Sequence, residues 1–138
     1  MMKNDTTHQD VINMMMWDLL EEMNFKKMLY TYSVDEVFDI EYEFLKNKVD
    51  SGELTFEDLQ EIRDNISAHA KVLFDRIGED WNRGDDGCMD IAEAAVAFGK
   101  ENYKKCLADH DYLISMREAT KEYENVLYAF NHVIDPKL

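Results

Sequence analysis

Apolar residues recur every three or four positions along most of this chain, which is the spacing of one face of an α-helix. No segment shows the strict alternation of apolar and polar residues that is typical of a strand. Only five glycines and one proline are present to interrupt helices. The sequence therefore predicts an all-α fold. The apolar stripes are Phe38, Tyr42, Leu45 and Val49; Leu59, Ile62, Ile66 and Leu73; Ile91, Ala95 and Phe98; and Tyr123, Val126, Phe130 and Val133.

Capping boxes mark where helices begin, because the Ser or Thr and the side chain three residues later each bond an otherwise unpaired backbone N–H. The chain has four such boxes, Thr6 to Gln9, Ser33 to Glu36, Thr55 to Asp58 and Ser115 to Glu118. A fifth start is expected near Asp86 or Gly87, with Asp86 as the cap.

Helix ends are expected at Gly52 and Gly78 and just before Pro136, because glycine commonly follows a helix and proline cannot extend one. At 138 residues the chain has the length of one ordinary domain. We therefore predict a single domain over residues 1–138, built as a compact antiparallel bundle of about five helices.

The first predicted helix is apolar around most of its circumference and rich in methionine. A helix of this kind is typically central in a core. Because methionine adapts to irregular surfaces, a homodimer contact through this helix is the alternative. Its apolar residues are Val11, Ile12, Met14, Met15, Met16, Trp17, Leu19, Leu20 and Met23.

Net charge is the second strong feature, and it is unevenly distributed. The formal charge of the whole chain is −15. Residues 35–93 hold 18 acids and six bases, a balance of −12, whereas the segments before and after carry −2 and −1. Such a charge excludes a nucleic acid backbone or an anionic membrane as the natural partner.

The mid-chain carboxylates repeat along two predicted helices, with Glu36, Asp39 and Glu43 on one and Glu57, Glu61 and Asp64 on the next. If the two helices are adjacent, the carboxylates form an anionic ribbon. Steps of about 4.5 and 6 Å along a helix are comparable with the roughly 3.4 Å advance of phosphates along a DNA strand. The residues predicted to bind the partner are Asp35, Glu36, Asp39, Glu41, Glu43, Asp50, Glu53, Glu57, Asp58, Glu61 and Asp64.

The pairs Glu36-x-x-Asp39 and Glu61-x-x-Asp64 resemble the carboxylate pairs of all-α nucleoside triphosphate pyrophosphatases. The helices of that family hold Mg²⁺ over a phosphate chain, and the resemblance implies the same role for these carboxylates. It covers four positions, and few bases stand nearby to hold a polyphosphate. A metal-dependent nucleotide pyrophosphatase is the enzyme alternative.

Residues 82–93 match part of an EF-hand calcium loop at Asp86, Gly87, Asp90 and Glu93, but the first ligand positions are weak or missing. A turn that caps the following helix is the favoured interpretation. No Glu-x-x-His pair, phosphate-binding loop or Cys–His pair is evident. We therefore expect no metal, no cofactor and no catalytic residues.

No stretch approaches the roughly 20 apolar residues of a membrane span, and the N-terminus lacks the pattern of a secretory signal. A cytoplasmic protein is expected. The leading hypothesis is a non-enzymatic binding protein that occupies the basic surface of a nuclease or another nucleic-acid-binding enzyme. It would act as an inhibitor or nucleic acid mimic, of the type used in phage counter-defence or immunity. An acidic helical scaffold or dimerisation module is a further alternative.

Overall fold

The computed structural model describes residues 7–81 and 84–136, and every regular element in these residues is helical, as predicted. They form eight α-helices and one 3₁₀ helix. The elements are α1 (His8–Met23), α2 (Phe25–Thr31), α3 (Val34–Asp50), α4 (Phe56–Ile77), η1 (Gly78–Trp81), α5 (Asp85–Ala97), α6 (Lys100–Ala108), α7 (His110–Ala119) and α8 (Val126–Ile134).

Two of the predicted capping boxes are confirmed. At α3, the Glu36 backbone donates to the Ser33 hydroxyl at 3.4 Å and the Ser33 backbone donates to the Glu36 carboxylate at 2.9 Å. Thr55 and Asp58 make the same reciprocal bonds at α4, at 2.9 and 3.0 Å. Gly52 follows α3 with a φ of 83°, and Gly78 directly follows α4. The starts and ends of these two helices are therefore as expected.

The first capping box is displaced by one residue. Thr6 lies outside the described residues, and the cap of α1 is Thr7, whose hydroxyl accepts from the Asp10 backbone. The segment also divides where the sequence predicts one helix. Asn24 adopts a left-handed conformation with φ of 53°, which ends α1 and starts α2.

The second half of the chain departs further from the prediction. Ser115 lies inside α7, where its hydroxyl donates to a backbone carbonyl, and Asp109 caps that helix instead. Gly99, with a φ of 112°, separates α5 from α6. Lys121 and Glu122 both adopt left-handed φ values and separate α7 from α8. These breaks raise the number of α-helices in the described residues to eight, in place of about five.

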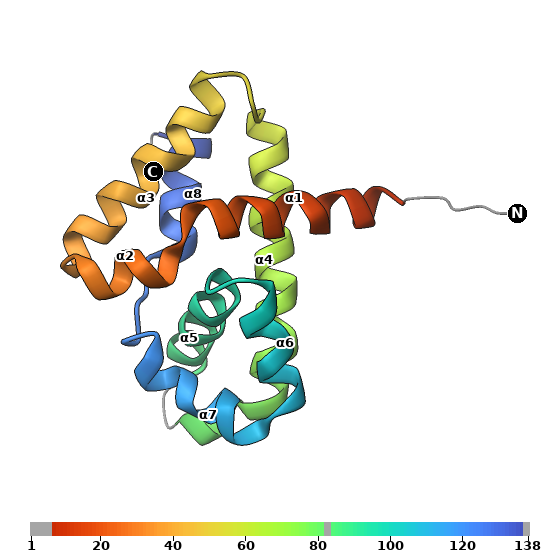
Figure 1. The fold of residues 1–138 in the computed structure, drawn as a ribbon, viewed down its shortest axis with the longest axis vertical. Coiled ribbons are helices and arrows are strands. Elements are labelled where there is room, and N and C mark those ends of the chain that lie inside the picture. The colour runs from red at the N-terminus through yellow and green to blue at the C-terminus, as the bar shows by residue number, and fades with distance from the viewer. Residues whose placement is uncertain (1–6, 82–83, 137–138) are drawn as a thin grey trace, which may run out of the picture.

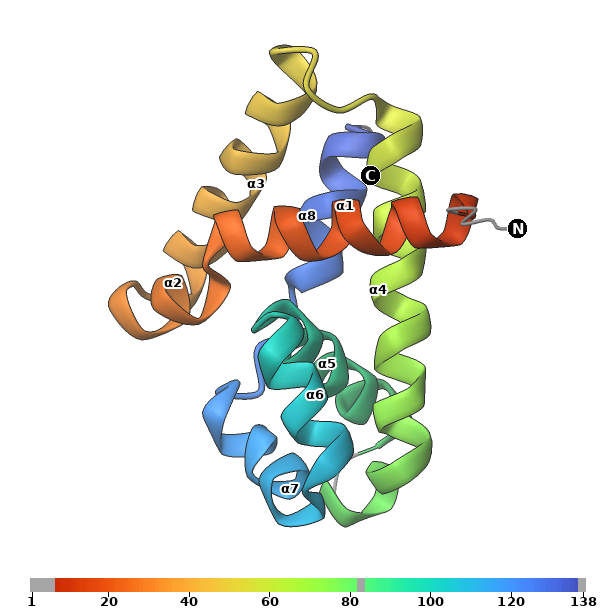
Figure 2. The ribbon, with the colours of Figure 1, turned by 45° about the vertical axis from the view of Figure 1, so that its right-hand side comes forward.

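Helix α4 is the longest element and organises the packing. Helix α1 lies across it, and α5 packs along its second half (Figure 1). Helices α3 and α4 diverge from the turn at residues 51–55, and α8 packs against both of them (Figure 2). The apolar core extends from Met16 on α1 to Val133 on α8. None of the described helices combines the length and apolar character needed to cross a bilayer.

Candidate functional site

The exposed acids of α3 share one side of that helix. Its buried residues are Val37, Glu41, Leu45 and Lys48, which face α8 and α2. At 100° per residue, the exposed acids lie within an arc of about 100° on the opposite side. We call this set the α3 acidic face; it consists of Asp35, Glu36, Asp39 and Glu43.

Most of the α3 acidic face lacks direct ion pairs with the described residues. Asp35, Asp39 and Glu43 make no ion pair with any residue that the structure describes. Glu36 serves the capping box, and its hydrogen bonds with Ser33 lower the pKa of its carboxyl. The face therefore presents four acidic side chains to solvent. From Asp35 to Glu43 it extends about 12 Å along the helix axis.

Glu41 is the one predicted partner-binding residue that the structure removes from the surface. It is fully buried, and neither carboxylate oxygen has a hydrogen-bond partner among the residues that the structure describes. Burial raises the pKa of Glu41 well above its ordinary value of 4.5. A fully buried carboxyl cannot contact a basic partner, so the prediction for this residue is wrong. The hydroxyl of Tyr123 is likewise buried and has no hydrogen-bond partner within residues 7–81 and 84–136, and burial raises the pKa of Tyr123.

The acids at the end of α3 are neutralised by neighbouring lysines. Lys46 pairs with Asp50 at 2.9 Å on the surface. Lys48 is only 8% exposed, and its ammonium donates to Glu53 at 2.8 Å and to Glu22 of α1 at 2.6 Å. These two carboxylates raise the pKa of Lys48 and compensate its burial. Asp50 and Glu53 therefore have less charge to offer a partner than the α3 acidic face.

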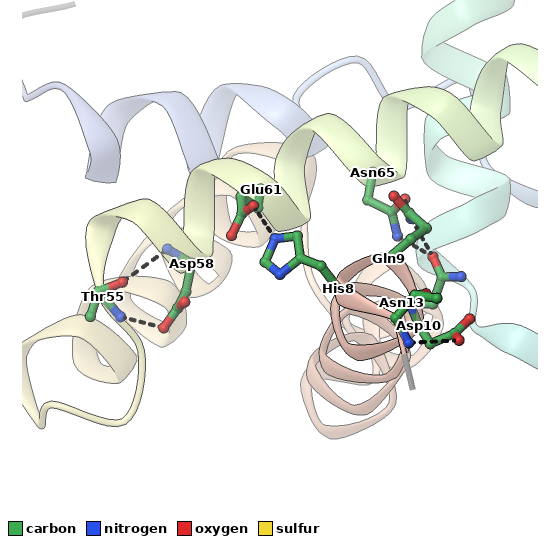
Figure 3. A network of polar contacts seen from close by, with 9 residues as sticks. His8, Gln9, Asp10, Asn13, Thr55, Asp58, Glu61 and Asn65 are labelled. Carbon is green, nitrogen blue, oxygen red and sulfur yellow. Dashed lines mark hydrogen bonds and ion pairs between the residues drawn. The ribbon is translucent and has the colours of Figure 1, made fainter. Parts of the chain in front are cut away.

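The acids of α4 mostly have local partners as well, as Figure 3 shows for its first half. Asp58 caps the helix through Thr55. Glu61 accepts from the His8 imidazole of α1 at 2.6 Å, and this contact raises the pKa of His8 above 6.5. Asp64 pairs with its neighbour Arg63 at 3.1 Å. Only Glu57 among the predicted α4 residues is exposed without a partner in the described residues.

The anionic ribbon over two adjacent helices is not formed as expected. Helix α3 packs chiefly on α8, whereas α4 packs chiefly on α5 and α1. The two acidic rows therefore stand on helices that diverge from the turn at residues 51–55 (Figures 1 and 2).

An amide network joins the start of α1 to the middle of α4. The Asn65 amide donates to Asn13 at 2.8 Å, and Gln9 donates to Asn65 at 2.8 Å and to Asn13 at 3.0 Å (Figure 3). The two contacts made by Asn65 span more than fifty residues of sequence, so no local pattern signals them. They fix the position of α1 across α4.

Among the described residues, no group of three or more His, Cys, Asp and Glu side chains is placed to hold a metal ion. The Glu36–Asp39 and Glu61–Asp64 pairs stand on separate helices, α3 and α4. Residues 82–83 of the EF-hand match lie outside the described residues, and the match from Asp85 onward is helical, with Gly84 as its cap. A calcium loop needs a sharp turn at its sixth position, but Gly87 lies inside a helix, so this segment is the beginning of α5.

Two buried or half-buried groups on α5 and α6 have strongly raised pKa values. Burial and the nearby Asp90 raise the pKa of Glu93 to about 7. Burial raises the pKa of the Cys106 thiol to about 12, and Cys88 is also a buried free cysteine. A thiol with this pKa is not a nucleophile at neutral pH. The cysteines lie on different helices, α5 and α6.

The methionine-rich helix is a core helix, in agreement with the favoured interpretation. Met16, Leu20 and Met23 of α1 are buried, whereas Met14 is 55% exposed. The homodimer alternative is untested.

Comparisons of the chain with protein-family models, with curated proteins and with solved structures found no match. The functional interpretation therefore rests on the charge and geometry described above.

Proposed function

We propose that this protein is a non-enzymatic binding protein whose α3 acidic face occupies a basic, nucleic-acid-binding surface of a protein partner. The observation that carries the proposal is a row of four exposed carboxylates on one side of a helix, three of them without an ion pair in the described residues. Such a row costs stability through self-repulsion, and a basic partner would relieve that repulsion.

The spacing of the carboxylates supports the mimicry of a phosphate backbone. Asp35, Asp39 and Glu43 follow one another at about 6 Å along the helix, and Glu36 lies between the first two in sequence. Arginine and lysine side chains that hold phosphates can also hold carboxylates. Occupation of that surface would prevent the partner from binding nucleic acid, which is inhibition by occupancy.

The test uses the full chain as bait in a host lysate at low salt. Wild type is compared with the triple variant D35N/D39N/E43Q, which leaves the Glu36 capping box intact. The control is D111N/E118Q/E124Q, which removes the same charge from exposed positions outside α3. We expect wild type and control to retain the same basic proteins, the α3 variant to lose them, and added duplex DNA to release them.

Retention of the same proteins by the α3 variant would refute the proposal. A complex that duplex DNA leaves intact would also refute it, because a nucleic acid mimic and nucleic acid itself compete for the same surface of the partner. A purified partner then allows the inhibition itself to be measured, as loss of its DNA binding on titration with this protein.

A further inference from the structure

A groove lies between the outer side of α1 and the start of α6, away from the α3 acidic face. Its volume is about 540 Å³. It combines acidic, apolar and aromatic side chains, with one lysine. The lining residues are Asp10, Asn13, Met14, Trp17, Asp18, Glu21, Lys100 and Glu101.

The helical repeat of α1 builds one wall of this groove. Asp10, Met14, Asp18 and Glu21 follow one exposed side of the helix, and Trp17 lies on the adjacent side. The other wall begins at Gly99, whose φ of 112° favours glycine. A Cβ there would lie 2.5 Å from Oε2 of Glu21, so the glycine permits the Glu21 carboxylate to lie against the start of α6.

Trp17 is a fixed aromatic wall. Its ring packs edge-on against His69, with centroids 5.3 Å apart, and against Tyr103 at 5.6 Å. These two ring contacts restrict the rotamers of Trp17, so little conformational entropy is lost when a ligand stacks on it. Beside it, Met14 is 55% exposed and adds adaptable apolar surface.

Carboxylates outnumber amines in the groove by four to one. Asp10 is used by the Thr7 cap, and Glu101 lies 3.8 Å from Lys104. Asp18 and Glu21, in contrast, form no ion pair within residues 7–81 and 84–136. An aromatic wall beside two unpaired carboxylates complements a cation that has a flat, weakly hydrated face.

We propose that this groove receives an arginine side chain from a basic segment of the partner protein. The guanidinium would stack on Trp17 and donate to Asp18 and Glu21, while the aliphatic part of the arginine packs on Met14. Arginine suits both contacts better than lysine, because its planar group stacks on aromatic rings and donates in a fixed fork. The inference rests on the proposed function in taking the occupant to belong to a basic protein.

The two tryptophans of the chain provide a direct readout. The Trp81 side chain is fully buried, and its indole donates to the Ile114 carbonyl at 3.2 Å. In a ¹H–¹⁵N spectrum the chain therefore has one indole signal at the groove and one internal reference, which the W17F variant assigns. The probe is the peptide acetyl-Gly-Arg-Gly-Arg-Gly-amide, and the neutral control replaces both arginines with citrulline.

We expect the arginine peptide to shift the Trp17 indole signal in a saturable manner and to leave the Trp81 signal in place. The citrulline peptide should produce no shift, and a lysine peptide should bind more weakly. The variant D18N/E21Q should weaken binding about tenfold, because it removes the charge-assisted hydrogen bonds. The charge-matched control D111N/E118Q, at exposed positions outside both the groove and the α3 acidic face, should bind as wild type does.

An unmoved Trp17 signal would overturn the inference. Equal binding of the citrulline peptide, or equal affinity of D18N/E21Q, would also overturn it. Failure here is separable from failure of the proposed function. If the peptide fails while D35N/D39N/E43Q still abolishes partner capture, only the groove assignment falls. If the peptide binds while that α3 variant captures the partner normally, only the role of α3 falls.

Discussion

Replacement of Glu41 by methionine should stabilise this protein. The Glu41 carboxyl is fully buried, and in the described part of the chain neither of its oxygens has a hydrogen-bond partner. It occupies a position on α3 between the buried residues Val37 and Leu45. Methionine has a similar length and no polar atoms that need a partner, so E41M should keep the packing and remove the desolvation cost.

The size of the effect follows from the burial. An unsatisfied buried polar group costs about 1–3 kcal/mol. With an unfolding entropy of roughly 2.1 cal/mol/K per residue over 138 residues, each kcal/mol corresponds to about 3.5 °C in Tm. E41M should therefore melt about 3–10 °C above wild type at neutral pH. The matched control E43M, at an exposed position two residues away, should show no comparable gain.

The pH dependence gives the same prediction a second, independent readout. Because burial raises the pKa of Glu41 well above 4.5, the folded protein keeps a proton that the unfolded chain releases above that pH. The contribution of this proton to stability is complete below pH 4.5 and declines as the pH rises toward the folded-state pKa. The stability gap between E41M and wild type should therefore widen between pH 4 and pH 8.

Chemical denaturation at several pH values measures both quantities. A second variant, Y123F, removes a buried hydroxyl that also lacks a partner, and it should not destabilise the protein. If E41M is less stable than wild type across the whole pH range, or if the gap is independent of pH, then Glu41 is not a buried, unpartnered acid and the reasoning fails.

Three further results are expected from other parts of the molecule. An NMR titration should give His8 a pKa above 6.5 because of its contact with Glu61. This ion pair therefore contributes to folding stability below pH 6.5, and the contribution is lost as the pH rises. An unchanged His8 pKa in the E61Q variant would contradict the contact. G99A should destabilise the protein by about 1–3 kcal/mol in a denaturation experiment, because it strains a left-handed backbone and places a Cβ against Glu21, and an unaffected variant would show that the approach is looser. Cys106, with a pKa of about 12, should react with a disulfide reagent only after unfolding, whereas rapid labelling of the native protein would be inconsistent with its burial.

The elements with local capping signals were predictable from the sequence, and those that depend on an isolated backbone conformation were not. Ser33 and Thr55 sit directly before helices α3 and α4 and satisfy their first backbone N–H groups. Nothing in the composition around Asn24 announces a left-handed residue that divides a long apolar segment. At α7, the carboxylate of Asp109 caps the helix, although the Ser115 box has the stronger pattern.

The candidate site was predictable only in part. The apolar periodicity of a helix indicates roughly which side is buried, but the helices packed against it decide which residues on that side lose contact with solvent. The stripe expected to face the core included Phe38 and Tyr42, which are half-buried. The fully buried side lies one position away and includes Glu41 and Lys48. The sequence signal for the burial of Glu41 was its spacing of four residues from Val37, which places both side chains on the same side of the helix.

Long-range contacts account for the rest of the difference. The carboxylates of Glu22 and Glu61 look free along the chain, but the fold places Lys48 and His8 against them. Among the described residues of α3, the exposed carboxylates that make no ion pair belong to the α3 acidic face. Local charge patterning therefore located the acidic region, and tertiary packing selected the carboxylates that stay available.

Titration of the captured partner with wild type and with D35N/D39N/E43Q, between about 50 and 300 mM salt, tests whether the outer side of α3 makes the contact. Wild type should lose affinity steeply as salt rises, and the variant should bind more weakly at low salt with a flatter dependence. An affinity that is independent of salt, or a variant that follows the wild-type curve, would contradict a contact made by the carboxylates of α3.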